Sequence, residues 1–159
     1  MHYNDRAMNA IELLTYLTEN QVSSLFRAAR SLPADKLDWK PAPGARSALD
    51  QVQEAATAID AFWDVYATGK VEWDSEKHAA WNAEKEKFTD LDALEAECKR
   101  TTQRLVDHMN TVKAGDLMNS VSLPFPGDHR VADILAYHYW NLAYHEGQIY
   151  YIGSLLAAE

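Results

Sequence analysis

Apolar residues recur at the 3.6-residue period of an α-helix along four long stretches of this chain. The stretches cover about residues 4–31, 47–67, 89–112 and 128–156. No stretch shows the convincing alternation of apolar and polar residues that is typical of a strand. The pattern therefore predicts an all-α fold built from four long helices.

Polar and helix-breaking residues mark the ends of these helices. The expected first caps are Ser47 for the second helix, Thr89 or Asp90 for the third and Asp128 for the last, and Gly69 is expected to end the second helix. The segments LPADKLDWKPAPGARS and AGDLMNSVSLPFPGDHR are rich in turn residues and predict long loops. Residues 71–87 are charged and predict a connection with a short helix. We therefore expect a four-helix bundle with long connections, forming a single domain over residues 1–159.

Composition limits the function. The net charge of -9 argues against binding to nucleic acid and to anionic membranes, because both need clustered Lys and Arg. No apolar run approaches the roughly 18–20 residues that cross a bilayer, and the first residues do not resemble a signal peptide. The single Cys98 excludes an internal disulfide framework, which fits a cytoplasmic protein, and we interpret it as an incidental thiol.

The segment HYWNLAYHEGQ, residues 138–148, carries the candidate chemistry. On a helical wheel, His138 and His145 fall on the apolar face with Leu135 and Leu142, and Asn141 lies at its edge. Buried polar side chains need partners, because leaving one unpaired costs about 1–3 kcal/mol. A metal ion and a hydrogen-bond network are the two candidates.

Spacing constrains a metal site on this helix. His138 and His145 lie seven residues apart, about 10.5 Å along the axis, which is awkward for binding one ion. Asn141 lies between them and within reach of both, but an amide oxygen is a poor ligand for a transition metal. The spacing alone leaves both candidates open.

Other residues of the segment, and the remaining histidines, receive simpler interpretations. Tyr137 and Tyr144 lie on a neighbouring face and are expected to line a cleft or to donate hydrogen bonds. Gly147 and Gln148 are interpreted as sites of close helix packing. The histidines expected to face solvent are His2, His78, His108 and His129.

The end of the chain, NLAYHEGQIYYIGSLL, resembles the last helix of the DinB-like (DinB/YfiT) superfamily, in which a His-x-x-x-His pair is followed closely by Gly-Gln. The loop LPADKLDWKPAPGARS is similar to the family's link between helices one and two. The resemblance implies a four-helix bundle, often a homodimer. It also implies a divalent metal, commonly Zn or Ni, held by one histidine on helix two and two on helix four.

The family's ligand positions carry over to Glu54, Asn141 and His145. Only His145 retains the histidine, and a carboxylate and an amide suit harder metals better. His138 is expected to act as a general base, to rotate in as a further ligand, or to hydrogen-bond Asn141 or Glu54. The alternative is a helix-packing histidine that is bonded to a neighbouring side chain. Glu54 lies about a right angle from the apolar stripe of its helix, so an exposed carboxylate is the alternative.

The resemblance implies a metal-dependent enzyme that acts on a small molecule, either a hydrolase or a thiol-dependent S-transferase. The alternative is a non-catalytic bundle that has lost its metal and works as a ligand-binding or interaction module. In a third reading the protein is a stable dimer whose buried polar residues only fix the register of the helices.

Overall fold

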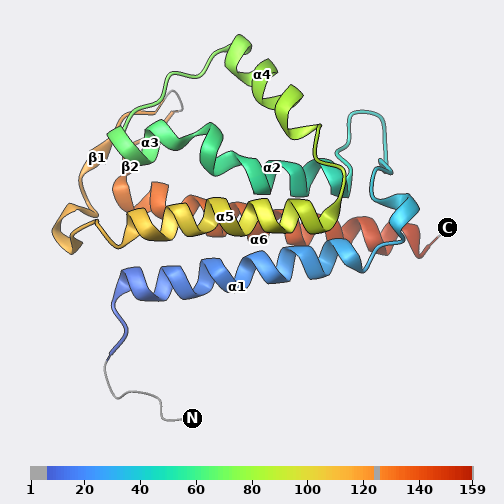
Figure 1. Cartoon of the computed structure of the whole chain (residues 1–159), viewed down its shortest axis with the longest axis horizontal. Coiled ribbons are helices and arrows are strands. Elements are labelled where there is room, and N and C mark those ends of the chain that lie inside the picture. Colours follow the sequence, from blue (N-terminus) through green and yellow to red (C-terminus); the bar gives the residue numbers. More distant parts are fainter. Residues whose placement is uncertain (1–6, 124–125, 159) are drawn as a thin grey trace.

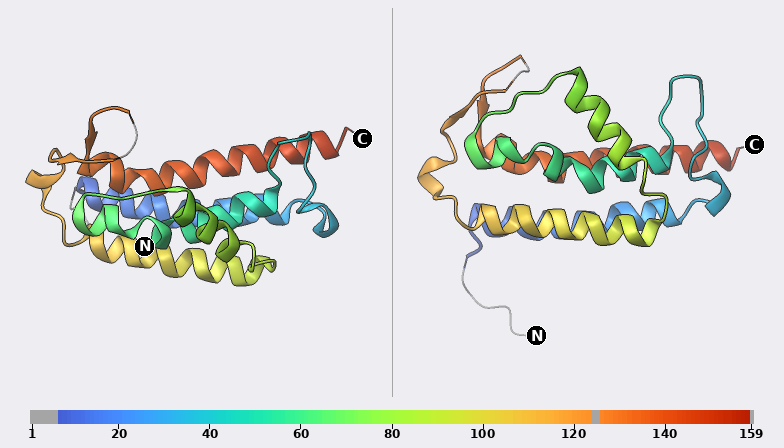
Figure 2. Two further views of the ribbon diagram at one scale, coloured as in Figure 1. Left: turned by 90° about the horizontal axis from the view of Figure 1, so that it is seen from above. Right: turned by 45° about the horizontal axis from the view of Figure 1, so that its top comes forward.

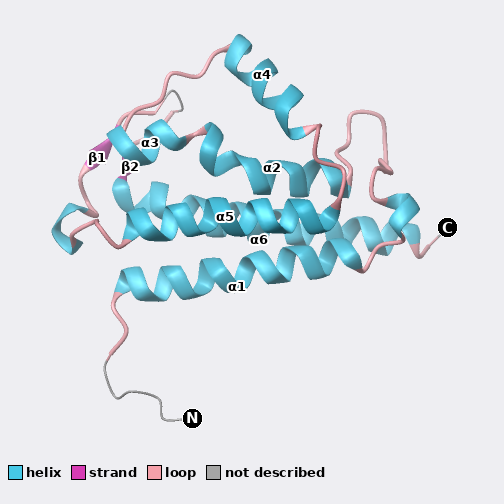
Figure 3. Ribbon diagram, in the orientation of Figure 1, coloured by secondary structure: helices cyan, strands magenta, loops and turns pink. Residues whose placement is uncertain are grey.

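The computed structural model describes residues 7–123 and 126–158. Its long helices are α1 (Ala10–Arg30), α2 (Ala48–Ala61), α5 (Leu91–Met109) and α6 (Val131–Leu156). The shorter elements are α3 (Trp63–Thr68), α4 (Ser75–Lys85), two 3-10 turns at Ala34–Lys36 and Ala114–Asp116, and strands β1 (Ser120–Val121) and β2 (His129–Arg130) (Figure 3). The predicted four-helix bundle with long connections is confirmed.

The long helices do not pack in the order of the chain. α1 lies against α6 and α5, and α2 lies against α5 and α6, so the first and last helices are neighbours (Figures 1 and 2). Figure 1 shows α4 on the outer side of α2, away from α1. The helix predicted within residues 71–87 therefore exists and lies outside the bundle of four.

Caps explain where α1, α2 and α5 begin. The Asn9 side chain accepts the N–H of Glu12, whose carboxylate accepts the N–H of Asn9 in return. This capping box starts α1 at Ala10, later than the predicted start, and residues 4–6 lie outside the described residues. Ser47 and Asp90 cap α2 and α5 as predicted.

The second predicted helix is interrupted at Phe62. This residue leaves the helical conformation at φ -105° and ψ 19°, so α2 ends at Ala61 and α3 resumes at Trp63. Phe62 packs against Trp73 and Trp81, with ring centroids 4.3 and 5.6 Å apart. Packing of Phe62 on the two tryptophans favours this break over a continuous helix. The prediction of an unbroken helix was therefore wrong. Gly69 ends α3 with a positive φ of 70°, as expected.

The last helix begins at Val131, so the prediction of Asp128 as its cap was wrong. His129 and Arg130 are held extended by antiparallel pairing with Val121 and Ser120. The carboxylate of Asp133 then accepts the N–H of Arg130 at 2.8 Å. Because of this strand pairing, α6 begins two residues later than a cap at Asp128 would give.

The core consists of two apolar clusters between the long helices. One contains Phe26, Val52, Leu94, Leu142 and Ile149, and the other contains Ile59, Tyr66, Leu105, Met109 and Leu135, among others. Buried histidines and an asparagine of α6 accompany them. Within residues 7–123 and 126–158, no helix has the length and apolarity that a bilayer crossing requires.

Candidate functional site

Glu54, Asn141 and His145 meet between α2 and α6. Oε1 of Glu54 lies 3.1 Å from Nε2 of His145 and 3.2 Å from Nδ2 of Asn141. The same Nδ2 lies 3.2 Å from Nε2 of His145. The three polar atoms therefore form a nearly equilateral triangle. Asn141 and His145 are buried, and the Glu54 side chain is 19% exposed, so Glu54 is not the exposed carboxylate of the alternative interpretation.

Two glutamines hold the imidazole of His145 from its other side. Nδ1 of His145 lies 3.1 Å from Oε1 of Gln51 and 3.2 Å from Oε1 of Gln148. Because both neighbours are acceptors, Nδ1 carries a proton and donates. Nε2 is thereby directed at Glu54 and Asn141. No pattern in the sequence indicated Gln51, which comes from the start of α2.

Arg46 supplies the positive charge beside Glu54. Its Nη1 lies 2.6 Å from Oε2 of Glu54, and its guanidinium also pairs with Asp50, which in turn binds Lys85 at 2.8 Å. Burial raises the pKa of Glu54, but the hydrogen bond from His145 and the charge of Arg46 outweigh it and lower the pKa to about 2. Glu54 is therefore ionised at neutral pH.

Only two of the three contacts in the triangle can be hydrogen bonds at the same time. If Nε2 of His145 is unprotonated, it accepts from Asn141 but faces the Glu54 carboxylate, a second acceptor. If Nε2 is protonated, it donates to Glu54 but faces the Asn141 amide, a second donor. A cation between the three residues removes this conflict once the amide oxygen of Asn141 faces it. That oxygen is buried and has no hydrogen-bond partner among the described residues.

His138 lies apart from this triangle. Its Nε2 is 2.9 Å from Oγ1 of Thr102 on α5, and no hydrogen bond joins it to Glu54, Asn141 or His145 in the described part of the chain. The side chain is 1% exposed, and burial lowers its pKa to about 4. It is therefore neutral at pH 7, and its role as a general base stays a prediction.

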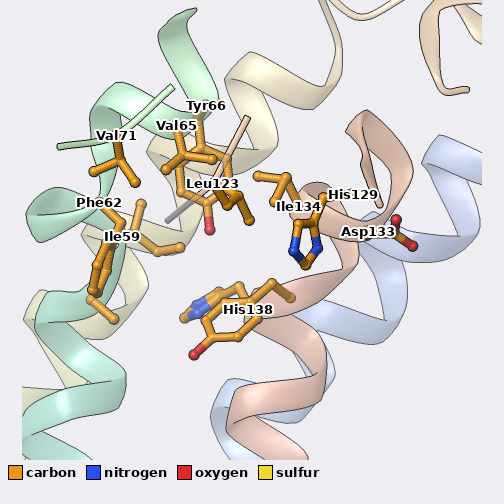
Figure 4. A pocket seen from close by; sticks show the side chains of 12 residues that line it. Ile59, Phe62, Val65, Tyr66, Val71, Leu123, His129, Asp133, Ile134 and His138 are labelled. Atoms are coloured by element: carbon orange, nitrogen blue, oxygen red, sulfur yellow. The ribbon is translucent and has the colours of Figure 1, made fainter. Parts of the chain in front are cut away.

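A cavity of about 220 Å³ lies beside His138, between α2 and α3 on one side and α6 and β2 on the other (Figure 4). Its walls include Ile59, Val65 and Ile134. Tyr137 also lines it, and burial together with the charge of Glu54 raises the pKa of this tyrosine. The expectation that Tyr137 lines a cleft is therefore confirmed.

Several minor predictions have different outcomes. Gly147 has open space where a side chain would lie, so its interpretation as a site of close packing was wrong. His129 was expected to face solvent but lines the cavity, and His2 lies outside the described residues. Cys98 is buried, and burial raises its pKa to about 12, which suits an inert thiol.

The donor set differs from a histidine site. No group of three His, Cys, Asp or Glu side chains that could hold a metal ion occurs among residues 7–123 and 126–158. The triangle contains two such residues, and its third member is the amide of Asn141. The arrangement can hold a cation through one nitrogen and two oxygens, or it can persist as a hydrogen-bonded cluster neutralised by Arg46.

A sequence profile of the DinB superfamily matches residues 16–149, which include all three members of the triangle. The chain belongs to the DinB superfamily. The predicted family is confirmed, and the match extends from α1 to the later turns of α6 of this DinB protein.

Two solved structures from Bacillus subtilis share this DinB fold. One is YfiT, described as "a probable metal-dependent hydrolase with an unusual four-helix bundle topology", at 13% identity and a TM-score of 0.78, covering 98% of this chain and 94% of YfiT. The other is the DinB-like protein YjoA, at 17% identity and a TM-score of 0.61, covering 91% and 92% of the two chains. No curated protein matches the sequence.

Proposed function

We propose that this DinB protein is an enzyme that uses one divalent metal ion, bound by Glu54, Asn141 and His145, to hydrolyse a small molecule. The proposal is carried by the triangle, in which three polar atoms from two helices lie 3.1–3.2 Å apart. Ligands of one small divalent ion lie about 3 Å from one another, because each is about 2 Å from the ion. The description of YfiT as a probable metal-dependent hydrolase supports the same class of reaction.

The surroundings of the triangle fit a cation. A metal-binding histidine usually donates its second N–H to a fixed acceptor, as His145 does to Gln51 and Gln148. The Asn141 amide presents its oxygen to the triangle after a half-turn, because its two ends have the same shape. One nitrogen and two oxygens suit a harder ion such as Mn²⁺ better than three imidazoles do. Zn²⁺ and Ni²⁺ are therefore expected to bind more weakly to this site than to a site of three histidines.

The remaining side chains of the site orient the substrate and hold protons. A bound divalent ion polarises a carbonyl and lowers the pKa of water. Tyr137, whose pKa is raised, keeps its hydroxyl proton at neutral pH and can donate a hydrogen bond. Transfer to a thiol is the related reaction, and it needs a thiol substrate from outside because Cys98 is buried in the core.

Metal content of protein purified without a polyhistidine tag tests the proposal. We expect one divalent ion per chain after incubation with Mn²⁺, Zn²⁺ or Ni²⁺ and removal of excess metal. His145→Ala should lose the ion, whereas His78→Ala, which removes an exposed histidine, should retain it. Substoichiometric metal that none of the three ions restores would refute the proposal.

The ion pair between Arg46 and Glu54 favours a second candidate, a non-catalytic bundle in which Arg46 replaces the metal. The two readings predict opposite effects of Arg46→Gln. If a metal binds, loss of the neighbouring positive charge should strengthen metal binding. If Arg46 is the only cation of the site, the variant leaves Glu54 with less compensation, so it should lower the free energy of unfolding without creating metal binding. Titration of metal and of denaturant on the same variant separates them.

A further inference from the structure

The cavity beside His138 has the size and walls of a binding site for a small organic molecule. Its volume of about 220 Å³ exceeds the roughly 150 Å³ that is enough for benzene in an apolar cavity. Most of its lining is aliphatic or aromatic, with Ile59, Phe62 and Val65 on one side and Ile134 on the other (Figure 4). A substituted benzene or a branched aliphatic group of similar size fits this space.

The charges around the cavity exclude an anion. No Lys or Arg of the described residues lines it. The charged side chain at its wall is Asp133, which already accepts the N–H of Arg130. His138 is neutral at pH 7, since burial lowers its pKa. A carboxylate placed here would lose its hydration without gaining a cation, so the occupant is expected to be uncharged.

One polar atom in the wall lacks a partner. Nε2 of His129 is buried and has no hydrogen-bond partner among the described residues, although the imidazole lines the cavity. Figure 4 shows the His129 ring turned toward the space that Ile134 and His138 also border. A buried nitrogen of this kind costs free energy unless a bound group pairs with it. A hydroxyl or amide on the ligand would satisfy it.

We propose that this cavity binds the apolar part of an uncharged substrate about the size of a substituted benzene, and that His129 pairs with one hydroxyl or amide of that molecule. The assignment of this molecule as the substrate rests on the proposed function. Ala58 and Tyr137 of the cavity wall lie one helical turn from Glu54 on α2 and from Asn141 on α6, so the cavity and the triangle occupy adjacent turns of the same two helices.

Three probes of similar shape test the proposal: 4-methylphenol, toluene and 4-methylbenzoate. Each is titrated into the full chain in the presence of a chelator, and binding is followed by the amide shifts in ¹H–¹⁵N spectra. We expect the two uncharged probes to bind with shifts at α3 and the start of α6. The benzoate should bind at least tenfold more weakly. Equal or tighter binding of the benzoate, or no binding of either uncharged probe to the folded chain, would overturn the proposal.

Two variants place the binding in this cavity. His129→Phe keeps the ring but removes the nitrogen, so it should weaken 4-methylphenol roughly three- to tenfold and leave toluene unchanged. Ile134→Trp fills the space and should abolish binding of both probes. Ala58→Leu adds a smaller side chain to the same cavity, and it is used if Ile134→Trp strongly lowers the melting temperature of the protein. Unchanged binding of both probes in the filled variants would place the ligand elsewhere and refute the proposal.

The chelator separates this proposal from the proposed function. Binding of the uncharged probes does not need metal, so its failure counts against the cavity alone. Absence of metal binding in the untagged protein, with the probes still bound, would leave a metal-free ligand-binding module and refute only the hydrolase.

Discussion

Because His138 is buried, the protein should become less stable as the pH falls below 6.5. Most of this loss should occur before the carboxylates of the protein begin to take up protons. The imidazole is 1% exposed, and burial lowers its pKa from 6.5 to about 4. Between these two values, the unfolded chain binds a proton at His138 that the folded chain does not. The free energy of unfolding therefore falls as pH falls from 6.5 toward 4, and above 6.5 this histidine contributes no pH dependence.

The size of the effect follows from the shift. Each pKa unit corresponds to about 1.4 kcal/mol, so the full loss is about 3 kcal/mol, of which about 2 kcal/mol is reached at pH 5. Glu54 acts over a different range. Its folded pKa of about 2 lies below the ordinary 4.5, so its contribution is present above 4.5 and is lost as pH falls below that value. Measurements between pH 7.5 and 5 thus isolate the histidine from the carboxylate.

Urea denaturation at pH 7.5, 6.5, 5.75 and 5 measures the effect. His138→Gln stays uncharged and can still hydrogen-bond Thr102. Between pH 7.5 and pH 5, its free energy of unfolding should therefore fall by about 2 kcal/mol less than that of the wild type. His78→Gln is the matched control at an exposed histidine and should follow the wild-type curve. If wild type and His138→Gln show the same pH dependence, the reasoning is refuted.

The remaining predictions concern the thiol, the core and the surface. Cys98, whose pKa is raised to about 12, should react with a thiol reagent only after denaturation, and fast labelling of the native protein would contradict this. Leu142→Ala should cost about 2–5 kcal/mol in urea denaturation, whereas Leu13→Ala, at a residue 48% exposed, should cost less than about 1 kcal/mol; equal costs would refute the packing argument. The exposed, stacked rings of Trp140 and Tyr144 on α6 motivate the proposal of a homodimer: sedimentation should give twice the chain mass, and Trp140→Glu should give the monomer. A wild-type monomer at high concentration would count against it.

The sequence predicted the long helices well because their burial follows one period. Leu135, Leu142 and Ile149 recur on one face of α6, and His138 and His145 are buried on that face as predicted. The errors arose where tertiary contacts decide the local conformation. Phe62 interrupts a stretch with good helical pattern because Trp73 and Trp81 pack on it from another segment.

The candidate site was only partly visible in the sequence. The resemblance indicated Glu54, Asn141 and His145, and the structure brings these three together. Helical periodicity could not place Glu54, because its polar partners lie outside α2: Arg46 reaches it from the preceding loop, and His145 lies on α6. Gln51 was equally hidden, since a polar residue in the first turn of a helix ordinarily faces solvent. Gln51 is recognised as part of the site only when α2 and α6 are seen side by side.

The neighbouring positions of α1 and α6 have a consequence for the order of assembly. Their shared apolar face joins the first and last helices of the chain, so it cannot be covered until nearly the whole sequence is available. Bundles whose neighbouring helices are consecutive close through short loops and fold quickly, whereas this arrangement requires a long-range closure. The triangle also forms by long-range closure, because Glu54 precedes Asn141 and His145 by 87 and 91 residues. On a ribosome, the side of α1 that packs on α6 would stay open until α6 emerges, and the site would be among the last parts to form.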